Sequence, residues 1–293
     1  MTILSTCIEN KLITPPKWLS PNTQYLCIMG SEAYGCATEF SDKDIYGYVI
    51  PPKGTLFPTT DGHIPGFGIK YKPDVFDQYQ EQHIIHNKVE YDFSIYNIVR
   101  YFQLCLECNP NMLDSLFVPN RCILHSSKLA QNIRDKRNLF IHKGYFHKAK
   151  GYAFSQMHKI KNERNVSGKR KEEIEKYGFS LKFAYHVVRL MYQAEQVLIE
   201  GTLDLERERG VYKAIRQGDW SLQRIEEFFE AKEKSLEQLY LDSRIPNDPS
   251  DNEKEIRNFL LECLEEHYGS LDKVVTKVSD EKLILDKIKL LVG

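Results

Sequence analysis

The chain has 293 residues, and its 40 Lys and Arg against 41 Asp and Glu leave a formal net charge of -1. This balance argues against attraction of the whole chain to nucleic acid or to an anionic membrane, although local charge can still recruit a partner. No apolar run approaches the ~20 residues of a membrane-spanning helix, and residues 1–10 lack the basic and apolar regions of a signal peptide. Seven irregularly spaced cysteines favour reduced thiols and a cytoplasmic location.

The first predicted element is a short buried strand at residues 25–29, Tyr-Leu-Cys-Ile-Met. It ends at Gly30 and Ser31, where two small residues indicate a turn. A residue without Cβ at position 30 lets backbone N–H groups approach a ligand, and the Ser31 hydroxyl adds a hydrogen-bond donor. The turn therefore suits a phosphate group.

Two aspartates follow this turn. Alternation along a strand sends Asp42 and Asp44 to one face and Lys43 to the other. Like charges so close together are costly unless a cation lies between them, and carboxylate oxygens are ligands that suit Mg²⁺. A solvated turn capped by Ser41 and Asp42 is the alternative for this motif in isolation. The succession of strand, Gly-Ser turn and carboxylate pair favours a metal site.

Residues 51–88 are rich in Pro, Gly and Thr and then become polar, which predicts a long connection with one hairpin. We interpret His83 and His86 within it as an exposed turn or hairpin pair and not as a metal site. The β-favouring run that follows, residues 88–96, alternates so that Glu90 and Asp92 share a face. Either carboxylate could therefore join the aspartate pair.

Gly30-Ser31 with Asp42 and Asp44 resembles the signature of the DNA polymerase beta nucleotidyltransferase superfamily. The closer likeness is to its predicted RNA-repair-pathway nucleotidyltransferases, and it covers roughly residues 20–265. Further matching segments are Ile95-Tyr96-Asn97-Ile98, Cys108-Asn109-Pro110-Asn111, Lys182 to Leu190 and Ile215-Arg216-Gln217-Gly218. The resemblance implies a mixed sheet that carries two metal-binding carboxylates and a third on a later strand.

The family pattern also identifies the third carboxylate. It places an Asp four residues before the Tyr of an Ile-Tyr pair, and Asp92 stands four residues before Tyr96. The resemblance therefore implies that Asp42, Asp44 and Asp92 are the catalytic, metal-binding residues of a site for two Mg²⁺ ions, with Mn²⁺ as a substitute. Glu90 is the alternative third carboxylate.

The chain beyond this strand is predicted to be helical. Apolar residues recur at helical spacing from Tyr96 to Leu106, and Asn109-Pro110 ends that helix, with Asn109 serving the turn. We expect an α+β architecture, in which a polymerase-beta-like core at residues 1–124 has a mixed sheet with flanking helices. An all-helical, substrate-binding domain at 125–268 and a charged tail at 269–293 complete the predicted division.

Residues 142–171 form a basic segment in which aromatic side chains are interleaved. The segment contains one acidic residue, Glu163. Its nine basic residues are Lys143, Lys148, Lys150, Lys159, Lys161, Arg164, Lys169, Arg170 and Lys171. The aromatic residues are Tyr145, Phe146, Tyr152 and Phe154. This mixture suits phosphate contacts with base stacking and predicts an RNA acceptor. A solvated helix face is the alternative.

A later helix, with Ser180 as its expected N-cap, carries Lys182, His186 and Arg189 on one face. Three cationic or potentially cationic groups in a row favour an anionic partner. With the family motif, they indicate a nucleotide-binding set of Gly30, Ser31, Lys182, His186 and Arg189. Arg216 also matches the family pattern, and a cation at a helix C-terminus explains it equally well.

The resulting hypothesis is a metal-dependent nucleotidyltransferase. It transfers a nucleoside monophosphate from an NTP, with ATP favoured, to an acceptor hydroxyl at an RNA 3′ end and releases pyrophosphate. The alternatives are AMP transfer to a protein or small molecule, and a non-catalytic nucleotide- or RNA-binding module. No membrane partner is expected, and the sequence does not indicate an oligomeric state.

Overall fold

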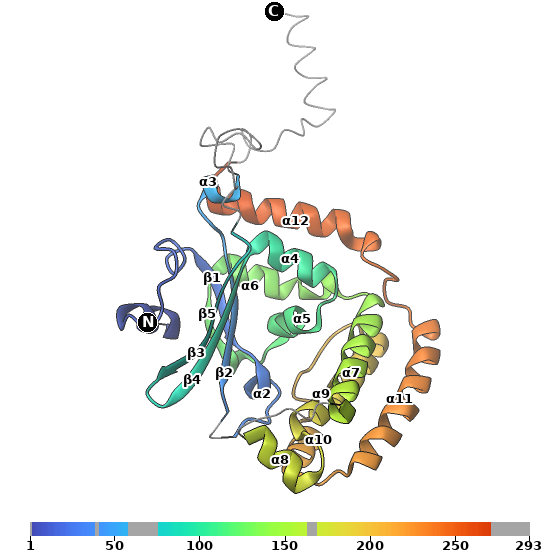
Figure 1. Cartoon of the computed structure of the whole chain (residues 1–293). Coiled ribbons are helices and arrows are strands. Elements are labelled where there is room, and N and C mark those ends of the chain that lie inside the picture. Colours follow the sequence, from blue (N-terminus) through green and yellow to red (C-terminus); the bar gives the residue numbers. More distant parts are fainter. Residues whose placement is uncertain (1, 39–40, 58–75, 163–168, 271–293) are drawn as a thin grey trace, which may run out of the picture.

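The computed structural model describes residues 2–38, 41–57, 76–162 and 169–270. Within these ranges a mixed sheet with flanking helices is followed by a helical region, which confirms the predicted α+β class (Figure 1). Residues 163–168 of the basic segment and 271–293 of the predicted tail lie outside the described ranges. None of the described helices is both long and apolar enough to cross a membrane. The seven cysteines are buried, free thiols.

The sheet has five strands in the order β3-β4-β2-β1-β5. Their bounds are Thr23–Ile28 (β1), Lys43–Val49 (β2), Gln78–His86 (β3), Val89–Asn97 (β4) and Ile123–Ser126 (β5). β2 and β4 run parallel, whereas the other neighbouring strands are antiparallel. The strands predicted at residues 25–29 and 88–96 correspond to β1 and β4, but β5 has no counterpart among the predicted elements.

A two-residue turn joins β3 to β4 and confirms the expected hairpin. Asn87 and Lys88 have φ of 49° and 66°, the left-handed backbone of the type I′ turn that suits twisted antiparallel strands. β3 also contains a bulge, because its pairing with β4 shifts between Glu81 and Ile84. His83 lies in the bulge with φ 59°. The bulge therefore lies opposite Asp92 of β4.

Alternation along the strands gives the sheet two different faces. On one face, Ile45 packs in a small core with Leu4 of α1 (Ile3–Glu9). Tyr48 points to the opposite face and belongs to the larger core, which the other helices share. Because residues an even number apart lie on the same side of a strand, Asp44 shares the face of Tyr48. The sheet therefore directs this carboxylate toward the helical side of the molecule.

Short helices connect the strands and cover the sheet. They are α2 (Gly30–Ala33), α3 (Lys53–Leu56), α4 (Ile98–Leu106), α5 (Pro110–Phe117) and α6 (Lys128–Asp135), with 3₁₀ turns at Asn120–Cys122 and Arg137–Phe140. The side-chain oxygen of Asn109 accepts from the backbone N–H groups of Asn111 and Met112 and so caps α5. This confirms the expected role of Asn109 in the turn.

Helices make up the second half of the described chain (Figure 1). They are α7 (Gly144–Asn162), α8 (Lys169–Tyr177), α9 (Leu181–Glu200), α10 (Arg209–Gln217), α11 (Leu222–Asp242) and α12 (Ser250–Tyr268). The long ones are α7, α9, α11 and α12. α9 packs against α7, α10 and α11 and is buried along most of its length. Ser180 is the N-cap of α9 by position, but its buried hydroxyl has no hydrogen-bond partner among the described residues. The expected side-chain cap is therefore not formed.

The two halves of the described chain share one hydrophobic core. α12 returns to pack against α4, and α7 contacts α5. The predicted boundary at residue 124 falls inside β5, whose residues pair with β1. The division into two domains remains a prediction.

Candidate active site

The turn after β1 brings Gly30 into contact with Asp44. Gly30 has φ 64°, a left-handed conformation that residues with a side chain rarely adopt. A Cβ added to Gly30 would lie 2.1 Å from Oδ2 of Asp44, and the Met29 N–H donates to the Asp44 carbonyl oxygen at 2.7 Å. Glycine is therefore required here by both the backbone conformation and the closeness of the carboxylate. The half-buried Ser31 follows in α2.

Gly30→Ala is expected to displace the Asp44 carboxylate and to lower the free energy of unfolding by about 1–3 kcal/mol, because the new Cβ meets an oxygen and the backbone is strained. Chemical denaturation measures this loss. Gly151→Ala in α7 is the matched control, since a Cβ there has no neighbour within 4 Å, and alanine should stabilise the helix slightly. Equal stability of the two variants would contradict the packing described here.

Three carboxylates converge beside this turn. Asp42 precedes β2, Asp44 lies in β2, and Asp44 pairs in register with Asp92 of the parallel strand β4. Burial raises the pKa of Asp44 to about 6, and the charges of Asp42 and Asp92 add to the rise while Lys182 opposes it. The charges of Asp42 and Asp92 therefore act on Asp44, whereas the ligand atoms that lie within 4.8 Å of one another in the described ranges are those of His83, Glu90 and Asp92. Carboxylate oxygens are ligands that suit a hard divalent cation.

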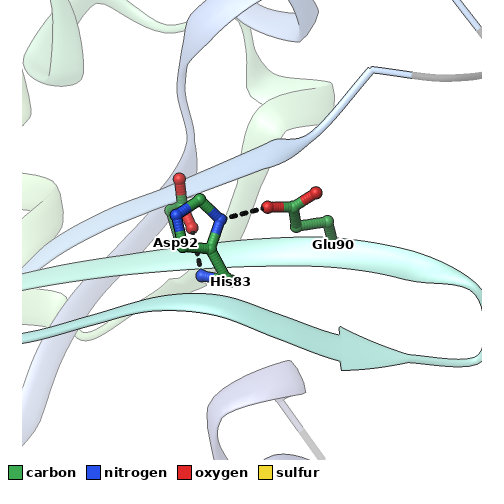
Figure 2. Close-up of side chains that lie close together, drawn as sticks. All are labelled: His83, Glu90 and Asp92. Carbon is green, nitrogen blue, oxygen red and sulfur yellow. Dashed lines mark hydrogen bonds and ion pairs between the residues drawn. The ribbon is translucent and has the colours of Figure 1, made fainter. Parts of the chain in front are cut away.

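Asp92 is held by the bulge of the neighbouring strand (Figure 2). The backbone N–H of His83 donates to Oδ1 of Asp92 at 2.8 Å, while Nδ1 of the His83 ring lies 2.5 Å from Oε1 of Glu90. Ligand atoms of these three side chains lie within 4.8 Å of one another. Glu90 is therefore directed to the exposed imidazole, whereas Asp92 faces both His83 and the in-register Asp44.

Sequence reasoning assigned no role to His83 beside Asp92. The contact depends on the bulge, which inserts residues opposite Asp92 and gives His83 its left-handed backbone. No residue type at this position signals a bulge, because the sequence here contains no glycine. The hairpin could be predicted, but its register could not.

Of the three predicted residues of α9, Lys182 acts on Asp44 and His186 lies among cations. The Lys182 side chain is exposed, and its charge lowers the pKa of Asp44, so it lies near the carboxylates. Burial and the charges of Arg189, Lys182 and Arg216 hold the pKa of His186 well below its ordinary value. His186 is therefore a neutral imidazole among cations at neutral pH.

Arg189 does not have the exposed environment expected of a residue that binds the triphosphate of a nucleotide. Its side chain is 3% exposed, and its guanidinium forms an ion pair with the fully buried Asp114 of α5 at 2.7 Å. It also donates to the Tyr34 hydroxyl at 2.9 Å and to the side-chain oxygen of Gln193 at 2.8 Å. The Tyr34 hydroxyl donates to the same Asp114 oxygen at 2.6 Å. This placement favours a positioning role that ties α9 to the segment following Gly30.

One feature of the sequence could have predicted the Arg189–Asp114 ion pair. Asp114 stands in the otherwise apolar part of α5, and buried charges need a partner. An acidic residue on a core-facing helix therefore indicates an internal cation, and Arg189 supplies it. Because Arg189 pairs with Asp114, its guanidinium is not exposed to a nucleotide in the site.

Much of the basic segment is neutralised or buried. Lys150 pairs with both Glu233 and Glu237 of α11 at 2.7 Å, and Lys161 pairs with Glu226 of the same helix at 2.9 Å. Tyr145 and Phe146 are core residues and cannot stack on a base, whereas Tyr152 and Phe154 are exposed. In the described part of the segment, salt bridges to α11 and burial therefore reduce the number of cations and aromatic rings that could contact RNA, and the RNA contact of this segment remains a prediction.

A mixed sheet with carboxylates on adjacent strands beside a Gly-Ser turn defines a nucleotidyltransferase-like protein. The chain belongs to RlaP, the RNA repair pathway DNA polymerase beta family, whose model matches residues 8–276. Among solved structures, a nucleotidyltransferase-like protein from Exiguobacterium sibiricum 255-15 is similar, with 11% identity over 81% of this chain and 73% of that one. Its TM-score of 0.29 is too low to support an argument. No match was found among curated proteins.

Proposed function

We propose that this protein transfers a nucleoside monophosphate from an NTP to the 3′-hydroxyl of an RNA and releases pyrophosphate. The observation that carries the proposal is the position of Asp44 beside Gly30 and in register with Asp92, where burial, and then the charges of Asp42 and Asp92, raise its pKa to about 6. Membership of the RNA repair pathway family supports RNA as the acceptor. A structural role alone gives no reason to gather three like charges.

The donor set fits Mg²⁺, with Mn²⁺ as a substitute. Asp42, Asp44 and Asp92 offer only carboxylate oxygens, and the pKa of Asp44 is raised by burial and by the other two charges. When bound, divalent ions stabilise charge on the attacking and leaving oxygens of an in-line displacement. The proposed role of the three aspartates is to hold two such ions.

The other residues of the site are proposed to bind and orient the nucleotide. Gly30 and Ser31 lie where a phosphate can approach the backbone, and Lys182 adds a cation on the opposite, helical side. His186 is a neutral hydrogen-bonding group, whose protonation an incoming polyphosphate would favour. Arg189 keeps α9 in place through Asp114 and Tyr34. ATP is the proposed nucleotide.

Replacing the third carboxylate distinguishes the two candidates on β4. Asp92→Asn is expected to lower the transfer rate by about a hundredfold or more, because a ligand oxygen beside Asp44 loses its charge. Glu90→Gln is the control two residues away, and its rate should stay within about threefold of wild type, since the Glu90 carboxylate pairs with the exposed His83 ring. Initial rates at saturating NTP provide the comparison. A larger loss in Glu90→Gln would reverse the assignment.

The proposed transfer to RNA is tested by finding which molecule receives the label of an α-labelled NTP. The protein is incubated with Mg²⁺ and each of four α-labelled NTPs, together with a short RNA that ends in either a 3′-hydroxyl or a 3′-deoxy sugar. We expect label in the 3′-hydroxyl RNA alone. Label on the protein or on a small molecule would replace RNA transfer with AMP-type modification, and NTP binding without any transfer would indicate a binding module.

A further inference from the structure

A surface hollow lies between the segment after α2 and the first turns of α10. Glu32, Gly35, Ala37 and Thr38 line it from one side, Arg209 and Lys213 from α10, and Arg121 and Glu206 close it. We call these eight residues, of which three are cations and two are acids, the α10 hollow. Glu32 belongs to α2, the short helix that begins at Gly30.

Of the three cations of the α10 hollow, one forms an ion pair with a described residue and two do not. Arg121 pairs with Glu206 at 3.0 Å and donates to the carbonyl oxygen of Glu32. Arg209 and Lys213 are exposed, and neither forms an ion pair with any residue in the described ranges. Lys150 and Lys161 of the basic segment, by contrast, are both paired. Arg209 and Lys213 are therefore two exposed cations that an anionic partner can contact, as are Lys148 and Lys159 of the basic segment, which form no ion pair within the described ranges.

The two free cations are held in a defined place. Arg209 and Lys213 are four residues apart and share one face of α10, with about 6 Å between them along the axis. The stem of Arg209 lies near Gly35, because a Cβ added to Gly35 would lie 3.4 Å from the Arg209 Cβ, and Oε1 of Glu206 would be nearer, at 2.8 Å. The Glu206 carboxylate therefore lies near the stem of Arg209.

A third cation on α10 continues the row toward α9. Arg216 stands three residues beyond Lys213, its guanidinium lies 5.8 Å from the centre of the Tyr185 ring, and its charge lowers the pKa of His186. The row therefore extends from the α10 hollow toward His186 of α9.

We propose that the α10 hollow binds the phosphodiester backbone of the acceptor RNA, just upstream of its 3′-terminal nucleotide. This rests on the proposed RNA-directed transfer, and it moves the acceptor contact from the basic segment to α10. Two unpaired cations about 6 Å apart can contact separate phosphates. The adjacent carboxylate of Glu206, held by Arg121, offers an acceptor for ribose hydroxyl groups, which RNA alone carries at the 2′ position.

The test uses the full chain and a 5′-fluorescent single-stranded RNA without NTP. Binding is followed by anisotropy over a range of salt concentrations for wild type and Arg209→Gln/Lys213→Gln. The variant should bind roughly tenfold more weakly at low salt, and its log–log salt slope should be shallower by about 1.4, because two phosphate contacts are lost. Lys213→Gln alone should give about half the change. Melting temperatures establish that each variant is folded.

A control variant, Lys148→Gln/Lys254→Gln, removes the same charge from exposed positions of α7 and α12 outside the hollow and should bind RNA within about twofold of wild type. Equal losses in both variants, unchanged RNA binding by Arg209→Gln/Lys213→Gln, or no RNA binding by wild type would overturn the inference. An equal loss of affinity for a fluorescent NTP would assign the hollow to the triphosphate instead.

Transfer kinetics separate this inference from the proposed function. In Arg209→Gln/Lys213→Gln, we expect the KM for RNA to rise roughly tenfold while kcat stays within about twofold, because the chemistry is untouched. Efficient transfer with an unchanged KM for RNA refutes only the inference. RNA binding that depends on Arg209 and Lys213 in a protein that transfers no nucleotide refutes only the proposed function.

Discussion

Asp44→Asn is expected to reduce nucleotidyl transfer by about a thousandfold or more while the protein stays folded. The asparagine keeps the size of the side chain beside Gly30 but removes the charge that the cluster needs to hold a cation. Loss of several kcal/mol of charge stabilisation in the transition state corresponds to this change in rate.

The same substitution should leave the metal-free protein at least as stable as wild type. Burial, Asp42 and Asp92 raise the pKa of Asp44 from 3.8 to about 6, so the folded state binds this proton more tightly than the unfolded state. Stability from this group therefore falls as pH rises from about 4 to 6, and its charge costs roughly 1–3 kcal/mol above that window. Asn avoids this cost.

Denaturation at pH 8 and pH 4 in a chelating buffer measures the stability difference. Asp44→Asn should gain on wild type at pH 8, and the gain should vanish at pH 4, where Asp44 is protonated. Added Mg²⁺ should raise the melting temperature of wild type more than that of the variant, because only wild type retains the full ligand set. Appreciable turnover by Asp44→Asn would remove Asp44 from the site.

Arg189→Met is expected to lower the free energy of unfolding by about 3–5 kcal/mol. The change leaves Asp114 fully buried without its cation, and an uncompensated buried charge is strongly destabilising. Arg189→Met/Asp114→Asn should recover a large part of the loss, since no buried charge then remains.

Urea unfolding of these variants is compared with Arg207→Gln. Arg207 pairs with Glu200 at the surface, where such a pair contributes less than about 1 kcal/mol. The account is wrong about Arg189 if Arg189→Met is no less stable than this surface control. An arginine that is exposed in the site and binds a triphosphate would show this small effect on stability when it is replaced.

The strands that carry the candidate site could be predicted because their side chains alternate. Apolar residues of β1 and β4 pack in the cores on the two faces of the sheet, and alternation along β2 puts Asp44 on the face of Tyr48, whereas Asp42 precedes the strand. β5 escaped prediction because its four half-buried residues, Ile123–Ser126, are too few to show a pattern. Its pairing with β1 is a tertiary contact, which also explains why a boundary drawn at residue 124 divides it.

The sequence could predict which residues share a helix face, but not which residues of other helices pack against that face. The spacing of Lys182, His186 and Arg189 on α9 is as expected, yet only Lys182 is exposed, while Arg189 meets Asp114 from α5. Lys150 likewise meets glutamates of α11 that lie more than 80 residues away in the chain. A charge run alone therefore does not show which of its cations are paired, and Arg209 and Lys213 of α10 form no such run.

The most direct test of the central claim is simultaneous measurement of RNA extension and pyrophosphate release by wild type. With Mg²⁺, an NTP and a 3′-hydroxyl RNA, we predict one pyrophosphate for each nucleotide added, and neither product when a chelator replaces Mg²⁺. Tight binding of the NTP and the RNA with no pyrophosphate released in the presence of Mg²⁺ or Mn²⁺ would contradict the account and leave the three aspartates without a catalytic role.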